Sequence, residues 1–214
     1  MKIHRFATAL TLLACSALAG PPMICHSIEI GGAKSLPWGS GPDWDARLPK
    51  YDTTHLITDT LDLLTGQTPV IVRMETLRRA AIYASGNPDL TRDLAQRLVE
   101  RTKQTQSDSL ASFDAGYFIE AVHQNAPMAK SDPLAGMDGY MLAKKALQGK
   151  DVATVEYGLA LIRGYTAWPN EHYRNAVLGA KEGSLLAANL LRFENKTTLA
   201  DVRAVVLAKA LAER

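Results

Sequence analysis

The sequence predicts an all-α fold in which antiparallel helical hairpins follow an extended N-terminal arm. From His55 onward the apolar residues recur every three or four positions, which is the spacing of one helix face. Residues typical of helix starts and ends separate these stretches, and no β-rich region competes with them. Short polar links favour antiparallel neighbours, arranged as either a stacked helical array or a compact bundle.

Residues 20–52 form the predicted arm. Proline and glycine recur too closely in this stretch for a helix to persist. Isoleucines alternate over residues 24–30, which indicates a short strand or an extended strip. Trp38, Trp44 and Tyr51 add aromatic surface that a disordered linker would lack. We therefore expect an ordered arm that covers an apolar seam between hairpins.

Residues 53–214 form a single predicted helical domain with eight helices. The seventh is expected to be long and bent near Gly179 and Gly183. The apolar stripes of the eight helices span residues 56–64, 71–84, 90–98, 110–122, 134–147, 152–162, 170–193 and 199–211.

Several of these helices have a recognisable N-terminal signal. Thr68-Pro69 and Asn87-Pro88 each pair a capping residue with proline at the first helical position. Asp151 and Asn170 can cap the sixth and seventh helices through a side-chain oxygen. Thr198 and Asp201 form a capping box with Asp in the place of Glu.

One of the helices resembles a tetratricopeptide repeat. Ala153, Tyr157 and Ala160 match the A-x3-aromatic-x2-A pattern of the second helix of that repeat. Gly139-Tyr140 is similar to the first helix, although its offset from Ala153 differs and Tyr165 replaces the usual proline. A second, aromatic-free echo of the pattern comprises Ala180, Ser184 and Ala187. The resemblance implies a helical scaffold whose concave face binds a protein or peptide.

Residues 1–19 have the pattern of a signal peptide. A basic start is followed by the apolar run 6–13 and by Ala17-Leu18-Ala19, which predicts cleavage before Gly20. Leu12 to Cys15 also resembles a bacterial lipobox, and Cys15 would then carry a lipid that tethers the chain to a membrane. Since no later stretch has the length and apolarity of a spanning helix, we expect an exported protein, periplasmic or secreted, without a transmembrane segment.

Charge and cysteine content exclude two classes of protein. Residues 1–19 hold two of the 24 basic residues and none of the 22 acidic ones, so the remainder has zero formal net charge. The remaining basic residues form no stripe of the kind that neutralises phosphates, and we expect no nucleic-acid partner. Cys25 would be the one cysteine left after cleavage, which rules out a disulfide scaffold.

Common catalytic motifs are absent. The sequence lacks G-x-S-x-G, G-x-x-x-x-G-K-[ST], G-x-G-x-x-G, H-E-x-x-H and C-x-x-C. We therefore predict an exported non-catalytic helical scaffold that binds a protein or peptide and needs no cofactor. An enzyme stays open as the alternative, either a small hydrolase or a metal-dependent enzyme.

Cys25-His26 is the dipeptide on which that alternative depends. A thiolate and an imidazole bind zinc, with His55, His123 or His172 as further ligands, or they act as a nucleophile and its base. The competing interpretation is structural: Cys25 is a small apolar residue buried where the arm packs.

Two further sets of residues are candidates for binding. Arg73, Glu75, Arg78 and Arg79 share one helix, where they form either ion pairs or a grip on a carboxylate or phosphate. Trp38 and Trp44 either dock the arm on the core or stack on a sugar or a peptide proline.

The start of the seventh helix offers one more pair of titratable residues. Glu171 and His172 could form an acid–base pair there. The simpler interpretation is that Asn170 caps this helix and Trp168 folds back on it. We expect Cys25, His26 and the Arg73 to Arg79 segment to lie scattered rather than around one cleft.

Overall fold

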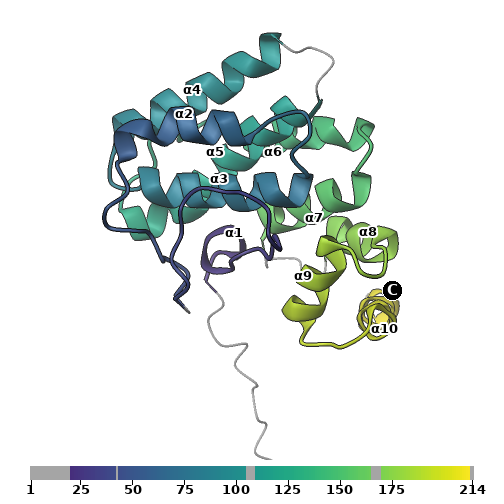
Figure 1. Cartoon of the computed structure of the whole chain (residues 1–214). Coiled ribbons are helices and arrows are strands. Elements are labelled where there is room, and N and C mark those ends of the chain that lie inside the picture. The colour runs from purple at the N-terminus through teal and green to yellow at the C-terminus, as the bar shows by residue number, and fades with distance from the viewer. Residues whose placement is uncertain (1–19, 42, 105–108, 165–169, 213–214) are drawn as a thin grey trace, which may run out of the picture.

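A computed structural model describes residues 20–41, 43–104, 109–164 and 170–212 of the chain. Within these ranges the chain forms ten α-helices and two short 3-10 helices, and no strand (Figure 1). The predicted all-α fold is confirmed. The elements are α1 (Pro22–Cys25), η1 (Thr53–His55), α2 (Leu56–Leu63), α3 (Val70–Ala84), α4 (Pro88–Gln104), α5 (Ser109–Ala129), α6 (Gly139–Lys144), η2 (Lys145–Gln148), α7 (Val152–Arg163), α8 (Glu171–Gly179), α9 (Leu185–Glu194) and α10 (Leu199–Ala212).

Side-chain caps begin four of the helices as the sequence predicts. The Asn87 side chain accepts a hydrogen bond from the backbone N–H of Leu90 at 3.1 Å. Asp151 and Asn170 accept from the third residue of α7 and α8 respectively. The Thr198 hydroxyl accepts from the N–H of Asp201 at 3.1 Å at the start of α10. These bonds satisfy N–H groups that have no partner within the helix.

The prediction that Thr68 caps α3 is wrong. Pro69 occupies the N-cap position, and no side chain caps this helix. The Thr68 hydroxyl instead donates to the carbonyl oxygen of Leu63 at 2.7 Å. The side chain therefore closes the loop between α2 and α3.

The long bent helix expected over residues 170–193 is two helices. The backbone leaves the helical region at Ala180, and Gly183 has a φ of +73°, which glycine adopts without a steric penalty. Ser184 then caps α9, because its hydroxyl accepts from the N–H of Ala187 at 3.1 Å. The break allows α8 and α9 to change direction (Figure 1).

Helix α3 lies at the centre of the molecule. Apart from Arg79, every residue of α3 is buried. In Figure 1, α2 and α4 lie above this helix and α1 lies below it, while part of the arm crosses in front of it. Because the rest of α3 is buried, its charged side chains other than Arg79 cannot reach bulk water and must find partners inside the protein.

Glycine allows α5 and α6 to approach each other closely. A Cβ atom added to Gly116 would lie 2.3 Å from the carbonyl oxygen of Gly139, and one added to Gly139 would lie 2.5 Å from that of Gly116. Real Cβ atoms do not tolerate such contacts with backbone. The first turn of α6 is therefore seated directly on the middle of α5.

The arm shares the hydrophobic core with the helices. Residues 22–25 form the short helix α1 instead of the expected start of a strand, and residues 26–30 are extended. Ile28 and Ile30 are buried while Glu29 between them is exposed, as expected for alternating side chains in an extended chain. Met23, Ile24 and Leu36 are fully buried in the same core.

Candidate functional site

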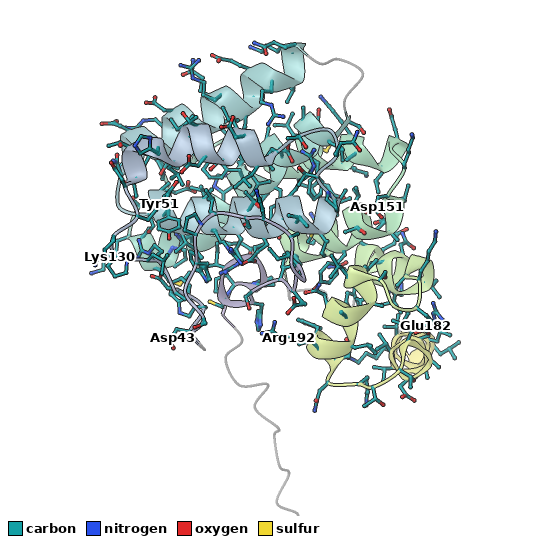
Figure 2. All side chains as sticks on the ribbon, viewed as in Figure 1. Asp43, Tyr51, Lys130, Asp151, Glu182 and Arg192 are labelled. Carbon is teal, nitrogen blue, oxygen red and sulfur yellow. The ribbon has the colours of Figure 1, made fainter. Side chains whose placement is uncertain are left out.

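The largest group of candidate residues lies around a cavity between the arm and helices α3, α7 and α9. Its volume is about 570 Å³, which is within the range of small-ligand sites. Figure 2 shows Asp43 of the arm and Arg192 of α9 at the same edge of the molecule, and both line this cavity. Among the sequence candidates, the lining includes Cys25, His26, Trp38, Trp44, Glu75 and Arg79. Cys25 and His26 thus line the same cavity as Glu75 and Arg79, and the expected scatter is wrong for these four residues.

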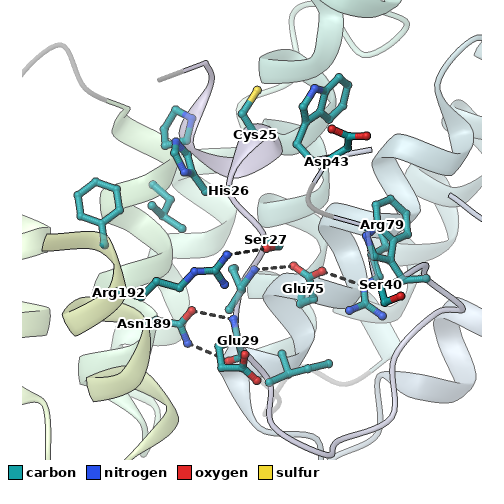
Figure 3. Close-up of a pocket in the computed structure, with 18 of the residues that line it drawn as sticks. Cys25, His26, Ser27, Glu29, Ser40, Asp43, Glu75, Arg79, Asn189 and Arg192 are labelled. Carbon is teal, nitrogen blue, oxygen red and sulfur yellow. Dashed lines mark hydrogen bonds and ion pairs between the residues drawn. The ribbon is translucent and has the colours of Figure 1, made fainter. Parts of the chain in front are cut away.

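The extended part of the arm is held from two sides. The backbone N–H of Ile28 donates to the carboxylate of Glu75 on α3 at 2.9 Å. On the other side, the Asn189 side chain on α9 accepts from the N–H of Glu29 and donates to the carbonyl oxygen of Glu29, both at 2.8 Å (Figure 3). A side-chain amide that bonds both the N–H and the C=O of one residue holds the backbone extended, whatever the side chain of that residue is.

A buried ionic cluster of Glu75, Arg78 and Arg79 forms the floor beneath the arm. The Glu75 carboxylate accepts from both arginines, with Nε–O distances of 2.8 Å to Arg78 and to Arg79. The side chains of Glu75 and Arg78 are fully buried, and that of Arg79 is 16 % exposed. Of the two interpretations offered by the sequence, these contacts favour the structural ion pairs, since the carboxylate that the arginines grip belongs to the chain itself.

The two arginines also bind the arm directly. Arg78 donates to the carbonyl oxygens of Ile24 and Trp44 at 2.9 and 3.0 Å, and Arg79 donates to that of Leu36 at 2.7 Å. The ring of Trp38 covers both guanidinium groups, at 5.1 Å from the Cζ of Arg78 and 5.6 Å from that of Arg79. Trp38 thus docks the arm on the core, and it also lines the cavity.

Arg73 belongs to a different part of the molecule. Its guanidinium group contacts the carboxylate of Asp114 on α5 at 2.5 Å, and both side chains are buried. It also donates to the carbonyl oxygens of Thr65 and Thr68 in the loop before α3. Arg73 therefore links α3 to α5 and does not line the cavity.

Cys25 and His26 both have shifted pKa values in this setting. Burial raises the pKa of the Cys25 thiol, and the nearby charge of Arg78 opposes this shift only in part. Burial also lowers the pKa of the His26 imidazole, with the charges of Arg192 and Arg78 adding to the effect. The thiol form and the neutral imidazole are favoured at neutral pH, which makes Cys25 a weak nucleophile.

The other histidines do not join Cys25 and His26. His123 contacts Asp132 at 2.8 Å, His55 lies 3.8 Å from Asp52, and His172 pairs with Glu156 rather than with Glu171. The described ranges hold no group of three or more His, Cys, Asp or Glu residues with the geometry of a metal site. The histidines named as further zinc ligands therefore lie elsewhere in the fold.

Helix α9 supplies cavity residues that the sequence did not single out. Asn189, Arg192 and Phe193 line the cavity opposite the tryptophans. The Arg192 guanidinium reaches Ser27 only over a long contact of 3.4 Å, while the ring of His26 meets that of Phe193 edge-on at 6.1 Å. No local pattern marks these residues, because they meet the arm only through a contact some 160 positions apart in the chain.

Comparisons with known proteins give no relative for this arrangement. No protein-family model, no curated protein and no solved structure matches the chain. Over the described ranges, none of the helices combines the length and the apolar character needed to cross a bilayer. Cys15 and Trp168 lie outside the described residues.

Proposed function

We propose that this chain is an exported helical scaffold that binds a short peptide in the cavity between the arm and α9, without a chemical step at Cys25. One observation carries the proposal: aromatic and guanidinium side chains from three separate segments surround one open cavity. Trp38 and Trp44 come from the arm, Arg79 from α3, and Arg192 and Phe193 from α9.

These side chains suit a peptide ligand with a carboxylate. Aromatic rings bury apolar side chains or proline, and a guanidinium group binds a carboxylate through two parallel hydrogen bonds. Arg192 is the better anchor, since Glu75 already neutralises part of the charge of Arg79. The cavity also holds the arm in extended form through Asn189, so the same face already accommodates extended backbone.

The alternative of a Cys–His hydrolase or metalloenzyme has less support. The raised pKa of Cys25 leaves the residue as a thiol at neutral pH. In the part of the chain that the structure describes, Cys25 and His26 belong to no group of three or more ligating residues, which suits packing better than catalysis or zinc binding.

Export and repeat architecture are supported by the sequence patterns. The basic and apolar order of residues 1–19 supports cleavage before Gly20, with lipidation of Cys15 as the second route. The repeat-like residues Ala153, Tyr157 and Ala160 lie on α7, which lines the cavity through Tyr157. Intact mass of the chain recovered from the envelope of an expressing bacterium distinguishes the two routes.

Selection of ligands from a random dodecapeptide library tests the binding proposal. Residues 20–214 are immobilised, and enriched peptides are labelled and titrated by fluorescence anisotropy. We expect peptides with an acidic residue or a free carboxyl terminus next to an apolar residue. Arg192→Glu and Trp44→Ala should each weaken their binding at least about tenfold, which corresponds to 1.4 kcal/mol.

Arg97→Glu on α4 is the matched control, because it makes the same charge reversal on an exposed side chain far along the chain from the cavity lining. Its binding should equal that of the unmodified chain. Enriched peptides that bind equally well to the Arg192→Glu and Trp44→Ala variants, or a library without any enriched peptide, would overturn the proposal.

A further inference from the structure

Three side chains from separate helices form a hydrogen-bonded series away from the cavity. His172, in the first turn of α8, bonds through Nδ1 to the carboxylate of Glu156 on α7. Its other ring nitrogen, Nε2, lies 2.8 Å from the hydroxyl of Tyr140 on α6. The side chains of His172 and Glu156 are only 15 % and 10 % exposed, so most of this series is shielded from water.

The partners of His172 determine the direction of the hydrogen bonds. Because a carboxylate only accepts, the Nδ1 of a neutral His172 carries the proton and donates to Glu156. Nε2 is then the acceptor, and the Tyr140 hydroxyl is the donor. Asn175 fixes the other oxygen of Glu156 by donating to it at 3.0 Å. The tautomer assigned in this way is the one in which His172 can take the phenolic proton.

Positive charges flank the ring of Tyr140. The Nζ of Lys144 lies 5.7 Å from the ring centroid, and the Cζ of Arg163 lies 5.3 Å from it. Both side chains are exposed, and neither forms an ion pair with a residue that the structure describes. Two such cations stabilise an anion formed or bound at this ring. Tyr140 itself is half-buried, and its backbone N–H donates to Glu120 at 3.0 Å, which fixes the start of α6.

A hydroxyl, an imidazole that can accept its proton, and a carboxylate that orients the imidazole are the parts of an activated nucleophile. We propose that Tyr140 is such a nucleophile and that it accepts acyl groups from carboxylic esters that carry a negative charge. His172 is the general base, Glu156 is a positioning residue, and Lys144 and Arg163 select the anionic ester. This activity is separate from the peptide binding proposed above and uses none of its residues.

The reaction proceeds in two steps. The Oη of Tyr140 attacks the ester carbonyl carbon, a C–O bond forms to the phenol, and the bond to the leaving alcohol oxygen breaks. The phenolic proton passes to His172 Nε2 and then to the departing oxygen. Water next attacks the acyl carbon while His172 takes its proton. The bond from that carbon to the Oη of Tyr140 breaks and the proton passes from His172 to Oη, which releases the carboxylic acid and restores the phenol.

Mono-4-nitrophenyl succinate, an anionic activated ester, is the probe for this activity. Residues 20–214 are mixed with it, 4-nitrophenolate release is followed by absorbance, and succinylated tyrosines are located by peptide mass spectrometry. We expect a burst of release and an adduct on Tyr140 that forms about 100-fold faster than on free N-acetyl-tyrosinamide at the same pH. Neutral 4-nitrophenyl acetate should react more slowly, and Lys144→Gln with Arg163→Gln should remove that preference.

Three variants separate activation from a structural role. His172→Gln should lower the rate of Tyr140 succinylation about 100-fold, and Glu156→Gln should lower it by a smaller factor. Tyr140→Phe keeps the ring and should abolish the burst. Tyr51 is the internal control, since its hydroxyl bonds to the carboxylate of Asp59 at 2.7 Å without an imidazole. The proposal fails if Tyr140 of the unmodified chain reacts no faster than N-acetyl-tyrosinamide, a comparison that depends on no variant, or if folded His172→Gln reacts as fast as the unmodified chain.

Discussion

Helix α3 buries two ionic groups on opposite sides, and each group holds a different part of the chain. On one side Arg73 pairs with Asp114 and joins α3 to α5. On the other side Glu75 pairs with Arg78 and Arg79 and joins α3 to the arm. Two residues along an α-helix are about 200° apart, so Arg73 and Glu75 cannot face the same way, whereas positions three and four beyond Glu75 return to its side.

The two groups differ in how they are neutralised. Asp114 has one close guanidinium partner, Arg73, and a second, partly exposed one, Arg101, at 3.8 Å, and two loop carbonyls complete the bonds of Arg73. The Glu75 cluster has two guanidinium groups for one carboxylate, so its excess positive charge depends on arm carbonyls and on the ring of Trp38. The contacts of Arg73 in the first group all join parts of the helical body. The second depends on hydrogen bonds and an aromatic ring that the arm supplies.

Glu75→Gln is the change with the largest expected effect. It leaves two buried or nearly buried arginines without their carboxylate, and the loss of one partner from a buried ion pair costs about 3–5 kcal/mol. Urea unfolding should show this loss in the free energy of unfolding. Glutamine also offers one acceptor oxygen where Glu75 offers two, so the N–H of Ile28 competes with the arginines for it, and trypsin should cleave after Lys34 in the arm much faster than in the unmodified chain.

The control for this change is Glu100→Gln, which removes the same charge from an exposed ion pair with Arg97 on α4. Exposed pairs contribute less than about 1 kcal/mol, and cleavage after Lys34 should not change. If Glu75→Gln were as stable as Glu100→Gln, the arm would be held by its apolar residues alone.

Asp114→Asn should have a smaller effect of a different kind. Asparagine keeps an oxygen that accepts from Arg73, and Arg73 keeps its two loop carbonyls, so the expected loss is about 1.5–3 kcal/mol. Because Asp114 pairs with Arg73 and Arg101, which lie on α3 and α4, the folded Asp114→Asn variant should be cleaved after Lys34 at nearly the rate of the unmodified chain. Release of the arm by Asp114→Asn would contradict the separation of the two groups.

The helical part of the fold was predictable because its causes are local. The caps at Asn87, Asp151, Asn170 and Thr198 depend on a side chain and an N–H group three residues away or fewer. The break within residues 180–184 was harder to predict from the sequence. Glycine permits the backbone angles of a bent helix and those of a full interruption, so Gly183 does not distinguish the two.

The candidate cavity was predictable only in part. The aromatic and charged residues of the arm and α3, which form one wall, stand out in the sequence. The opposite wall belongs to α9, which reaches the cavity only through tertiary contacts. Arg73 does not belong with Arg78 and Arg79, and helix geometry explains why. Arg73 lies two positions before Glu75 and therefore faces the opposite side of the helix. His172 illustrates the same limit, because its neighbour Glu171 suggested a pair, whereas the partner Glu156 comes from α7.

The smallest expected effect concerns His26 of the arm. It is a change with pH in the free energy of unfolding. Burial, then the charges of Arg192 and Arg78, hold the pKa of His26 in the folded protein below the usual value of about 6.5. As the pH falls below about 6.5, the unfolded chain therefore binds a proton before the folded chain does, and the free energy of unfolding decreases. One proton limits this slope to about 1.4 kcal/mol per pH unit.

His26→Asn removes that contribution, so the difference in free energy of unfolding between the unmodified chain and this variant should shrink from pH 8 to pH 5. Urea titrations at four pH values measure it, with exposed His55→Asn as the matched control. Arg192→Gln should diminish the effect without abolishing it, because burial is its larger cause. A difference that stays constant with pH would mean that His26 takes up its proton equally in both states. The arm would then leave His26 in contact with water instead of burying it near Arg78.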